Sequence, residues 1–207
     1  MTDMKKMIQQ ASLILMMMLT SISSHAQVSK EAQAVINNIM TRASVRGFIE
    51  KPVEQEKVNI MLRAAMAAPT DKNKQPWHFV VLNTPETVGA YYGEGPRAER
   101  MKKTPLVIVL CADTTRMQQG EVRDIWVQDL SAATENLLLA AHALELGAVW
   151  TTIYPLEKRV EGVQQKLNLP SHLIPMCAVR IGYPNPERPA KPKDKWDEQK
   201  VTYGPWK

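Results

Sequence analysis

Cysteine is scarce in this 207-residue chain, which contains only Cys111 and Cys177. Two cysteines so far apart exclude a disulfide-stabilised scaffold, and the lack of a C-x-x-C pair excludes the common zinc and redox motifs. Both lie in apolar segments, where a small core residue is one interpretation. A disulfide is the other, if the two segments are neighbouring strands in an oxidising compartment. The sequence predicts no metal site.

Several catalytic motifs are also missing. The chain has no H-E-x-x-H, no Walker phosphate loop, no G-x-S-x-G and no complete G-x-G-x-x-G, of which Gly93-Glu94-Gly95 is only a fragment. Its histidines are isolated from one another in the sequence, which favours structural roles. Nothing in the chain therefore suggests a metalloprotease, a phosphate-loop NTPase, a serine hydrolase or a dinucleotide-binding Rossmann enzyme.

Charge of one sign is present in only a small excess, with 26 Lys and Arg against 21 Asp and Glu. Removal of residues 1–26 would leave this excess almost unchanged. An excess this small, spread through the sequence, does not indicate nucleic-acid binding, but it fits a local pocket for an anion. With 44% hydrophobic and 23% charged residues, the chain is predicted to form one ordinary globular domain.

Long hydrophobic runs are absent except near the N-terminus. Lys5 and Lys6 precede an apolar run from Ala11 to Leu19, and Ser24-His25-Ala26 supplies small residues at a cleavage site. This pattern is typical of a secretory signal peptide. The run is about half the ~20 residues that span a bilayer, so a retained anchor is disfavoured. We expect residues 1–26 to be a signal peptide, with cleavage near Ala26/Gln27, and residues 27–207 to be an exported, periplasmic domain without a membrane anchor.

Hydrophobic periodicity predicts alternating helices and strands in the exported part. Helices are expected over residues 30–40, 54–68, 124–146 and 157–167, and strands over 78–82, 106–111, 148–153 and 176–181. The 124–146 helix is apolar over most of its circumference, so it belongs in a core or a subunit interface, and Gly147 is expected to cap it. The whole is predicted to be one domain of helices packed around a sheet.

Three polar segments are difficult to explain by packing. Arg42, Ser44 and Arg46 recur at every second residue, so an extended chain would point them to one side, as an anion site requires. The loop from Pro69 to Trp77 carries amides that can bind a heterocycle. The tail adds the cations Lys193 and Lys195. A solvated basic turn and a charged surface run remain the alternatives for the first and third segments.

Together and in this order, the three segments resemble the nitroreductase family of flavoproteins. The R-x-S-x-R segment and the P-[ST]-x-x-N-x-Q-P-W loop match that family at the right spacing, and the resemblance covers the chain from about Val35 to Trp206. It implies an α+β three-layer sandwich that forms a homodimer, with one FMN at each of two sites in the subunit interface. The long apolar helix is what such an interface would need.

The resemblance also assigns roles to individual residues. Arg42 would meet the FMN phosphate, Ser44 the polar chain or ring edge, and Arg46 the N1/O2 edge of the isoalloxazine. The loop that would reach in from the other subunit contributes Pro69, Thr70, Asn73 and Gln75. The strand that would lie along the flavin contributes Trp150, Thr151 and Thr152. The tail would bind the phosphate with Lys193 and Lys195. The position of Lys195 is commonly Arg in the family, and Lys cannot bind phosphate through two parallel hydrogen bonds.

The implied activity is an FMN-dependent oxidoreductase that reduces nitroaromatic, quinone or related electron-poor substrates by two electrons, in a ping-pong hydride mechanism. NAD(P)H is the expected reductant, although it is scarce outside the cytoplasm and another donor is an alternative. No acid–base pair is needed, because the flavin carries the chemistry and Arg46 tunes it. Alternatives are a flavin-binding or scavenging protein without turnover, a reductive dehalogenase-type flavoprotein, and anion or nucleic-acid binding through the basic segments.

Overall fold

The computed structural model describes residues 28–206, apart from the side chain of Arg97, and the predicted signal peptide lies outside this range. The chain divides into two compact units, residues 1–37 and 38–207. Of the first unit, the structure describes only the start of helix α2 (Lys30–Thr41). Every other element belongs to the second unit, which carries the sheet and the candidate site.

The second unit is a three-layer sandwich around one four-stranded antiparallel sheet of order β1-β2-β4-β3. Its strands are β1 (Trp77–Leu82), β2 (Leu106–Asp113), β3 (Gly147–Thr152) and β4 (Leu173–Gly182). The helices are α3 (Gln55–Met66), α4 (Pro85–Tyr92), α5 (Pro96–Lys102), α6 (Trp126–Ala143) and α7 (Glu157–Lys166). Short 3-10 turns cover Asp71–Asn73, Gly120–Ile125 and Glu198–Lys200. This confirms the predicted α+β fold.

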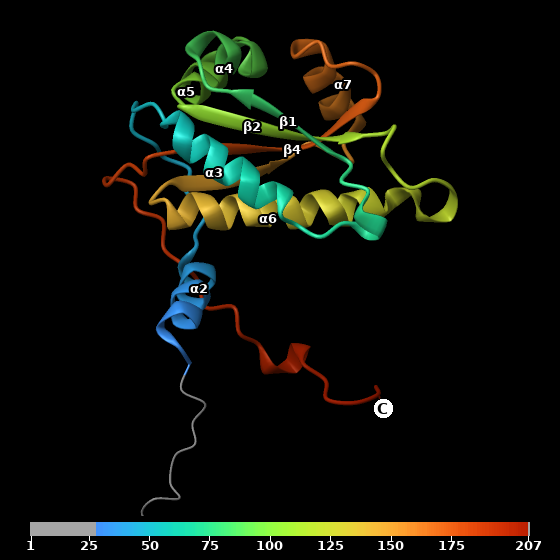
Figure 1. The fold of residues 1–207 in the computed structure, drawn as a ribbon. Helices are drawn as coiled ribbons and strands as arrows, with labels where there is room; N and C mark the ends of the chain where they lie inside the picture. Colours follow the sequence, from blue (N-terminus) through green and yellow to red (C-terminus); the bar gives the residue numbers. More distant parts are fainter. Residues whose placement is uncertain (1–27, 207) are drawn as a thin grey trace, which may run out of the picture. The chain divides into compact units, whose positions relative to one another are not determined.

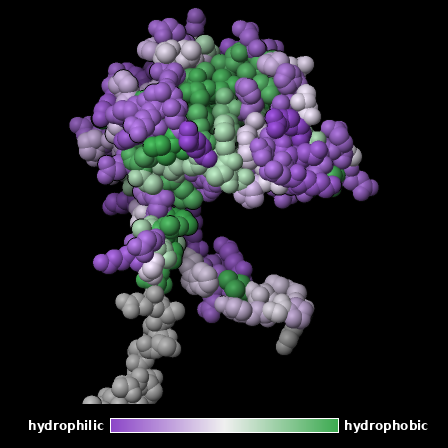
Figure 2. All heavy atoms as spheres, in the orientation of Figure 1, coloured by the Kyte–Doolittle hydropathy of each residue, from purple (hydrophilic) through white to green (hydrophobic). Residues whose placement is uncertain are grey.

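The two faces of the sheet carry different helices (Figure 1). α6 packs on one face with α3 against it, and α4, α5 and α7 cover the other. Side chains of β2 are buried on both faces over almost its whole length, as expected of a central strand. Apolar surface gathers over the β1 and β2 side of the sheet, between the polar surfaces of the helices (Figure 2).

The apolar side chains of α6 are buried within the chain itself. Eight of its side chains are buried, among them Leu130, Leu137 and Leu138, which pack in the core with α3 and the sheet. Its last turn is tied to the end of α2, where Asn38 Nδ2 donates to the Leu139 carbonyl at 3.0 Å. Of the two environments predicted for this helix, a core and a subunit interface, the structure shows the core. Burial within the chain is enough to account for its apolar side chains.

Several boundaries differ from the sequence-based prediction. Gly147 does not cap α6: the helix ends at Ala143, and the chain turns at Glu145, whose φ is 62°. β4 begins at Leu173, before the predicted start at residue 176. The register of β2 and β4 shifts where Cys111 pairs with Pro175, and this irregularity accommodates a proline, which has no N–H to donate. Helices α4 and α5 were not predicted from the sequence. Only Val88 is buried in α4, so its helical periodicity is weak, although Thr84 caps it.

Cys111 and Cys177 are both buried and free. They lie in the adjacent strands β2 and β4 but on opposite faces of the sheet, Cys177 in the cluster under α6 and Cys111 in the cluster under α7. Side chains on opposite faces of a sheet point apart, so the disulfide alternative is wrong. Burial raises the pKa of both thiols to about 12, which keeps them protonated and unreactive at neutral pH.

Candidate functional site

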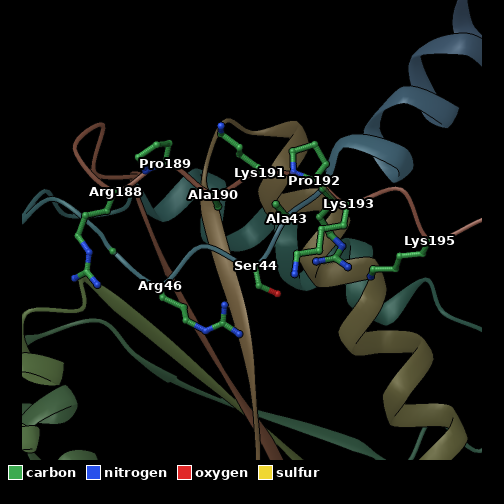
Figure 3. Close-up of a pocket in the computed structure, with 12 residues that line it drawn as sticks. Ala43, Ser44, Arg46, Arg188, Pro189, Ala190, Lys191, Pro192, Lys193 and Lys195 are labelled. Atoms are coloured by element: carbon green, nitrogen blue, oxygen red, sulfur yellow. The ribbon is translucent and has the colours of Figure 1, made fainter.

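A cavity of about 580 Å³ lies where the first basic segment meets the C-terminal tail. Its walls are residues 42–47 from the connection between α2 and α3, except Val45, and residues 188–195 from the tail, except Asp194 (Figure 3). No lining side chain is acidic, whereas six are cationic: Arg42, Arg46, Arg188, Lys191, Lys193 and Lys195. Such a concentration of cations around one cavity is suited to a multiply charged anion.

The first segment runs alongside the outer strand β3. Val45 N donates to the Ala148 carbonyl at 3.0 Å, and Ser44 forms an isolated parallel bridge with Ala148. Val45 is buried, while its neighbours Ser44 and Arg46 are exposed and point into the cavity (Figure 3). Arg42, Ser44 and Arg46 all line this one cavity. The structure thus brings the three side chains of the R-x-S-x-R segment to one cavity, although Ala43 lines it as well.

A pair of glycines lets this segment lie close to the sheet. Gly147 and Gly182 face each other in the register of β3 and β4. A Cβ on Gly147 would lie 2.6 Å from Val45 Cβ, and one on Gly182 would lie 3.1 Å from Phe48 Cβ. Side chains at these two positions would push the segment away from the sheet. This role could not be predicted from the sequence, because close approach between distant segments leaves no local pattern.

Arg42 is held by an ion pair with helix α6. Its Nε donates to Glu135 Oε1 at 3.0 Å, and the Arg42 side chain is largely buried, with 21% exposed. One carboxylate on Nε leaves the other guanidinium N–H groups for a ligand in the cavity. Glu135 was not predicted from the sequence, because its position opposite Arg42 depends on how α6 packs.

The tail contributes the opposite wall. Lys193 and Lys195 point toward Ser44, whereas Lys191 and Arg188 extend in other directions (Figure 3). The structure therefore brings together both predicted tail lysines and the R-x-S-x-R segment. Arg188 and Lys191 are additional cations that sequence analysis passed over, although they are part of the same proline-rich run.

The Pro69–Gln75 loop lies elsewhere in the chain and does not line the cavity. Its backbone is unusual, since Lys72, Asn73 and Gln75 have φ of 46°, 54° and 49°. These values are in the left-handed region, which costs free energy for residues other than glycine and often marks functional sites. The loop is fixed by internal bonds: Gln75 N donates to Thr70 Oγ1 at 3.1 Å, and Gln75 Nε2 donates to Asn73 Oδ1 at 2.8 Å.

One further bond ties this loop to α6. Asp71 N donates to Asp129 Oδ1 at 3.0 Å, and the Asp129 side chain is buried in the first turn of that helix. Burial raises the pKa of the Asp129 carboxyl above its ordinary value, against the effect of this bond. The loop is thus anchored to the core, while Pro69 and Asn73 stay exposed.

The end of β3 is divided between the two faces of the sheet. Trp150 packs against the cluster under α6. Thr151 and Thr152 are exposed and line a second cavity, on the face that carries α4, α5 and α7. None of the three lines the basic cavity, so their predicted contact with the flavin stays a prediction. Among the described residues, no three metal-ligating side chains cluster, and no helix is long and apolar enough to cross a membrane.

Comparison with known proteins agrees with this architecture. The model of the nitroreductase family matches residues 39–94 and 91–183, more than half of the chain. The chain belongs to the nitroreductase family. A protein of Methanothermobacter thermautotrophicus, provisionally named NADH dehydrogenase/NAD(P)H nitroreductase, is 35% identical over 185 residues, which cover 89% of this chain and 94% of that protein.

Two solved structures of family members match over most of their length. One, from Bacteroides thetaiotaomicron, has the same provisional name, is 39% identical, and has a TM-score of 0.74 over 84% of this chain and 98% of that one. The other, a provisionally named nitroreductase from Desulfovibrio desulfuricans in complex with FMN, is 27% identical, with a TM-score of 0.67 over 84% of this chain and 98% of that one. The resemblance seen in the sequence is confirmed.

Proposed function

We propose that this protein is an FMN-dependent, NAD(P)H-linked oxidoreductase and that the basic cavity holds the FMN phosphate. The observation that carries the proposal is the convergence of the R-x-S-x-R segment and the tail lysines on one cavity without a lining carboxylate. Family membership, a relative named as an NAD(P)H nitroreductase and a similar structure that contains FMN support it. A phosphate dianion would also offset the mutual repulsion of these cations.

The residues present fit the cofactor. Arg42, positioned by Glu135, would bind phosphate oxygens through its remaining N–H groups, and Lys193 and Lys195 would add point charges from the other wall. Ser44 points into the same cavity and would donate its hydroxyl to the phosphate or the polar chain. Lys195 stands where Arg is common in the family, so one bidentate contact with the phosphate is lost.

The bound flavin would supply the two-electron transfer, so the protein's task is to bind, orient and tune it. Arg46 lines the cavity and is exposed, and no described carboxylate forms an ion pair with it. Its charge is therefore available to stabilise negative charge on the N1/O2 edge of a reduced flavin.

Arg46→Gln tests this assignment, because it deletes the charge and keeps a hydrogen-bond donor. Loss of about 1.4–3 kcal/mol of stabilisation of the reduced flavin should lower the two-electron potential by about 30–65 mV. The affinity for oxidised FMN should change less. Redox titration measures the potential, with Arg46→Lys as the control that keeps the charge and most of the wild-type value. Equal potentials in wild type and Arg46→Gln would remove Arg46 from the site.

The substrates we propose are nitroaromatics, quinones or related electron-poor acceptors, reduced in a ping-pong cycle. We also propose that the N-terminal segment directs export of the protein to the periplasm. The electron donor in that compartment must then be identified separately from the nucleotide that reduces the purified protein. Immunodetection of the chain in periplasmic and cytoplasmic fractions, with and without residues 1–26, tests the export. A full-length, uncleaved chain confined to the cytoplasm would refute it.

We further propose a homodimer with the FMN sites at its interface. In the second unit, Ile39 and Met40 are 51% and 64% exposed, and the tail aromatics Trp196, Tyr203 and Trp206 are 72%, 91% and 85% exposed. Apolar side chains this exposed are typical of surfaces that a partner covers. The anchored Pro69–Gln75 loop does not line its own chain's cavity, which fits a loop that acts on the partner's site.

Mixed dimers test this arrangement directly. Arg42→Ala and Asn73→Ala chains should each bind FMN weakly alone. If the loop acts in trans, a dimer containing one of each chain has one site with both wild-type residues. Random mixing of equal amounts makes about half of the dimers mixed, so about a quarter of the tight FMN sites should return. Sedimentation establishes the dimer at micromolar concentration. A monomer that binds FMN tightly, or mixing without any recovery, would contradict the proposal.

A further inference from the structure

The Pro69–Gln75 loop keeps an unfavourable backbone conformation at the surface. Lys72, Asn73 and Gln75 all have positive φ, a region that asparagine tolerates better than lysine or glutamine. Three such residues in one loop persist only where the surrounding contacts hold them there. The side chains of Lys72 and Asn73 are exposed, so their own packing does not explain the conformation. Hydrogen bonds must therefore hold the loop.

The hydrogen bonds of the loop are of two kinds. Bonds among Thr70, Asn73 and Gln75 set its shape, but they lie within the loop and leave its direction free. Its direction depends on Asp71, whose N donates to Asp129 Oδ1 at 3.0 Å. This bond ties the loop to the first turn of α6, beside which it lies (Figure 1).

Asp129 is an unusual residue for its place in α6. It is 6% exposed, and its helix neighbours Leu130 and Ala133 lie in the core. A carboxylate there loses its hydration, which the positive end of the helix and one bond from a neutral amide offset only in part. In the described part of the chain, its one side-chain hydrogen bond goes to the loop and not to an N–H of α6. An apolar residue would fill this place at less cost, so the acid has a role that core packing does not explain.

We propose that Asp129 is a positioning residue for flavin binding, which fixes the direction of the Pro69–Gln75 loop so that Asn73 reaches the FMN. Gln75 Nε2 donates to Asn73 Oδ1 and leaves the N–H groups of the Asn73 amide as donors for the cofactor. In the proposed dimer this FMN is the partner's. The inference thus rests on the proposed function, because it needs an FMN site that the loop can reach.

Helix α6 would then serve both flavin sites of the dimer. Asp129 acts on the loop that enters the partner's site, whereas Glu135, about 9 Å further along the helix axis, holds Arg42 in the cavity of its own chain. A change at Asp129 that merely disturbs α6 would weaken the site of its own chain. Loss of the direction of the loop would weaken the site of the partner, so experiment can separate the two cases.

Two variants of Asp129 test whether the acceptor matters. Asp129→Leu removes it at similar side-chain size, and Asp129→Asn keeps an acceptor oxygen without the charge. We expect Asp129→Leu to bind FMN about ten- to a hundredfold more weakly than wild type, as weakly as Asn73→Ala, and Asp129→Asn to stay close to wild type. The double variant Asn73→Ala/Asp129→Leu should be no weaker than either single variant, because Asp129 acts only through the loop. Thr134→Val, a buried change elsewhere in α6, is the control and should keep wild-type affinity.

Mixed dimers identify the site that Asp129 serves. Asp129→Leu mixed with Arg42→Ala should restore about a quarter of the tight FMN sites, because one site of each mixed dimer combines an intact loop with an intact cavity. Asp129→Leu mixed with Asn73→Ala should restore none, because every site then has a defective loop. Recovery with Asn73→Ala but not with Arg42→Ala would overturn the proposal, since Asp129 would then act on the cavity of its own chain.

Asp71 provides a second test if Asp129→Leu does not fold. Asp71→Pro removes the N–H that donates to Asp129, and Thr70 already has φ of −137° and ψ of 153°, the extended conformation that precedes a proline. Asp71→Ala is the matched control, since it keeps the N–H and loses only the bond from Gln118 Nε2 to Asp71 Oδ2. We expect Asp71→Pro to bind FMN as weakly as Asn73→Ala, and Asp71→Ala to lose less affinity. Equal losses in both would overturn the role of Asp129.

Hydrogen exchange of the protein without FMN separates this inference from the proposed function. Amides of the Pro69–Gln75 loop should exchange faster in Asp129→Leu than in wild type, and at the wild-type rate in Asp129→Asn. Equal exchange in wild type and Asp129→Leu, or equal FMN affinity, would overturn the inference and leave the flavin assignment intact. A protein that binds no FMN, or Arg42→Ala and Asn73→Ala chains that do not complement each other, would instead contradict the proposed function or its dimer.

Discussion

Gly147→Ala is expected to damage the flavin site more than any other single-methyl change in the chain. The new Cβ would lie 2.6 Å from Val45 Cβ, so the segment that carries Arg42, Ser44 and Arg46 must move away from β3. Overpacking of this kind costs about 1–3 kcal/mol of the free energy of unfolding. Displacement of a charge-assisted phosphate contact should weaken FMN binding by about ten- to a hundredfold.

Urea unfolding and fluorescence titration with FMN measure the two effects of Gly147→Ala. Gly162→Ala is the control, because its Cβ meets open space in α7. That change should raise stability by about 0.5–1 kcal/mol and leave FMN affinity unchanged. A Gly147→Ala protein with wild-type stability and affinity would show that the segment does not need this close approach.

Arg42→Ala is expected to have a comparably large effect on FMN affinity and a smaller one on stability. It removes the one cation of the cavity that a helix holds in place, through the 3.0 Å bond between Arg42 Nε and Glu135. We expect a loss of about 1.5–3 kcal/mol of binding free energy, or about ten- to a hundredfold in Kd. Riboflavin, which lacks the phosphate, should bind wild type and variant alike.

The comparison of FMN with riboflavin makes the Arg42 prediction specific for the phosphate. A variant that loses affinity for both ligands equally would point to a distorted ring site. A variant that keeps its FMN affinity would exclude Arg42 as a phosphate ligand. Arg63→Ala, a change of an exposed arginine on α3, controls for the loss of one positive charge.

Much of the fold could be predicted from periodicity, because its central elements bury regular apolar patterns. The helix at Gln55–Met66, the buried strand at Leu106–Asp113 and the helix at Trp126–Ala143 all carry such patterns. α4 escaped because it buries only Val88, and α5 because it is one short, highly charged stretch. Gly147 was misread as a helix cap, since its function comes from Val45, a hundred residues away in the sequence.

The cationic part of the site was predictable for a different reason. Arg42, Ser44 and Arg46 alternate locally, and Lys193 and Lys195 have no structural need in a tail without a core, so both signals are visible in the sequence. Glu135 and Arg188 join the site only through tertiary packing. The second cavity could not be predicted from the sequence either, because its walls come from α4, α5, α7 and two strands.

Anaerobic addition of NADH or NADPH to the purified protein loaded with FMN tests the central claim most directly. The account predicts a yellow protein with one FMN per chain, whose visible flavin absorbance bleaches with reductant and returns when an electron-poor quinone or nitroaromatic is added. A protein that binds no FMN would contradict the assignment of the basic cavity. A protein that binds FMN tightly and is bleached by neither nucleotide would contradict the proposed NAD(P)H-linked activity.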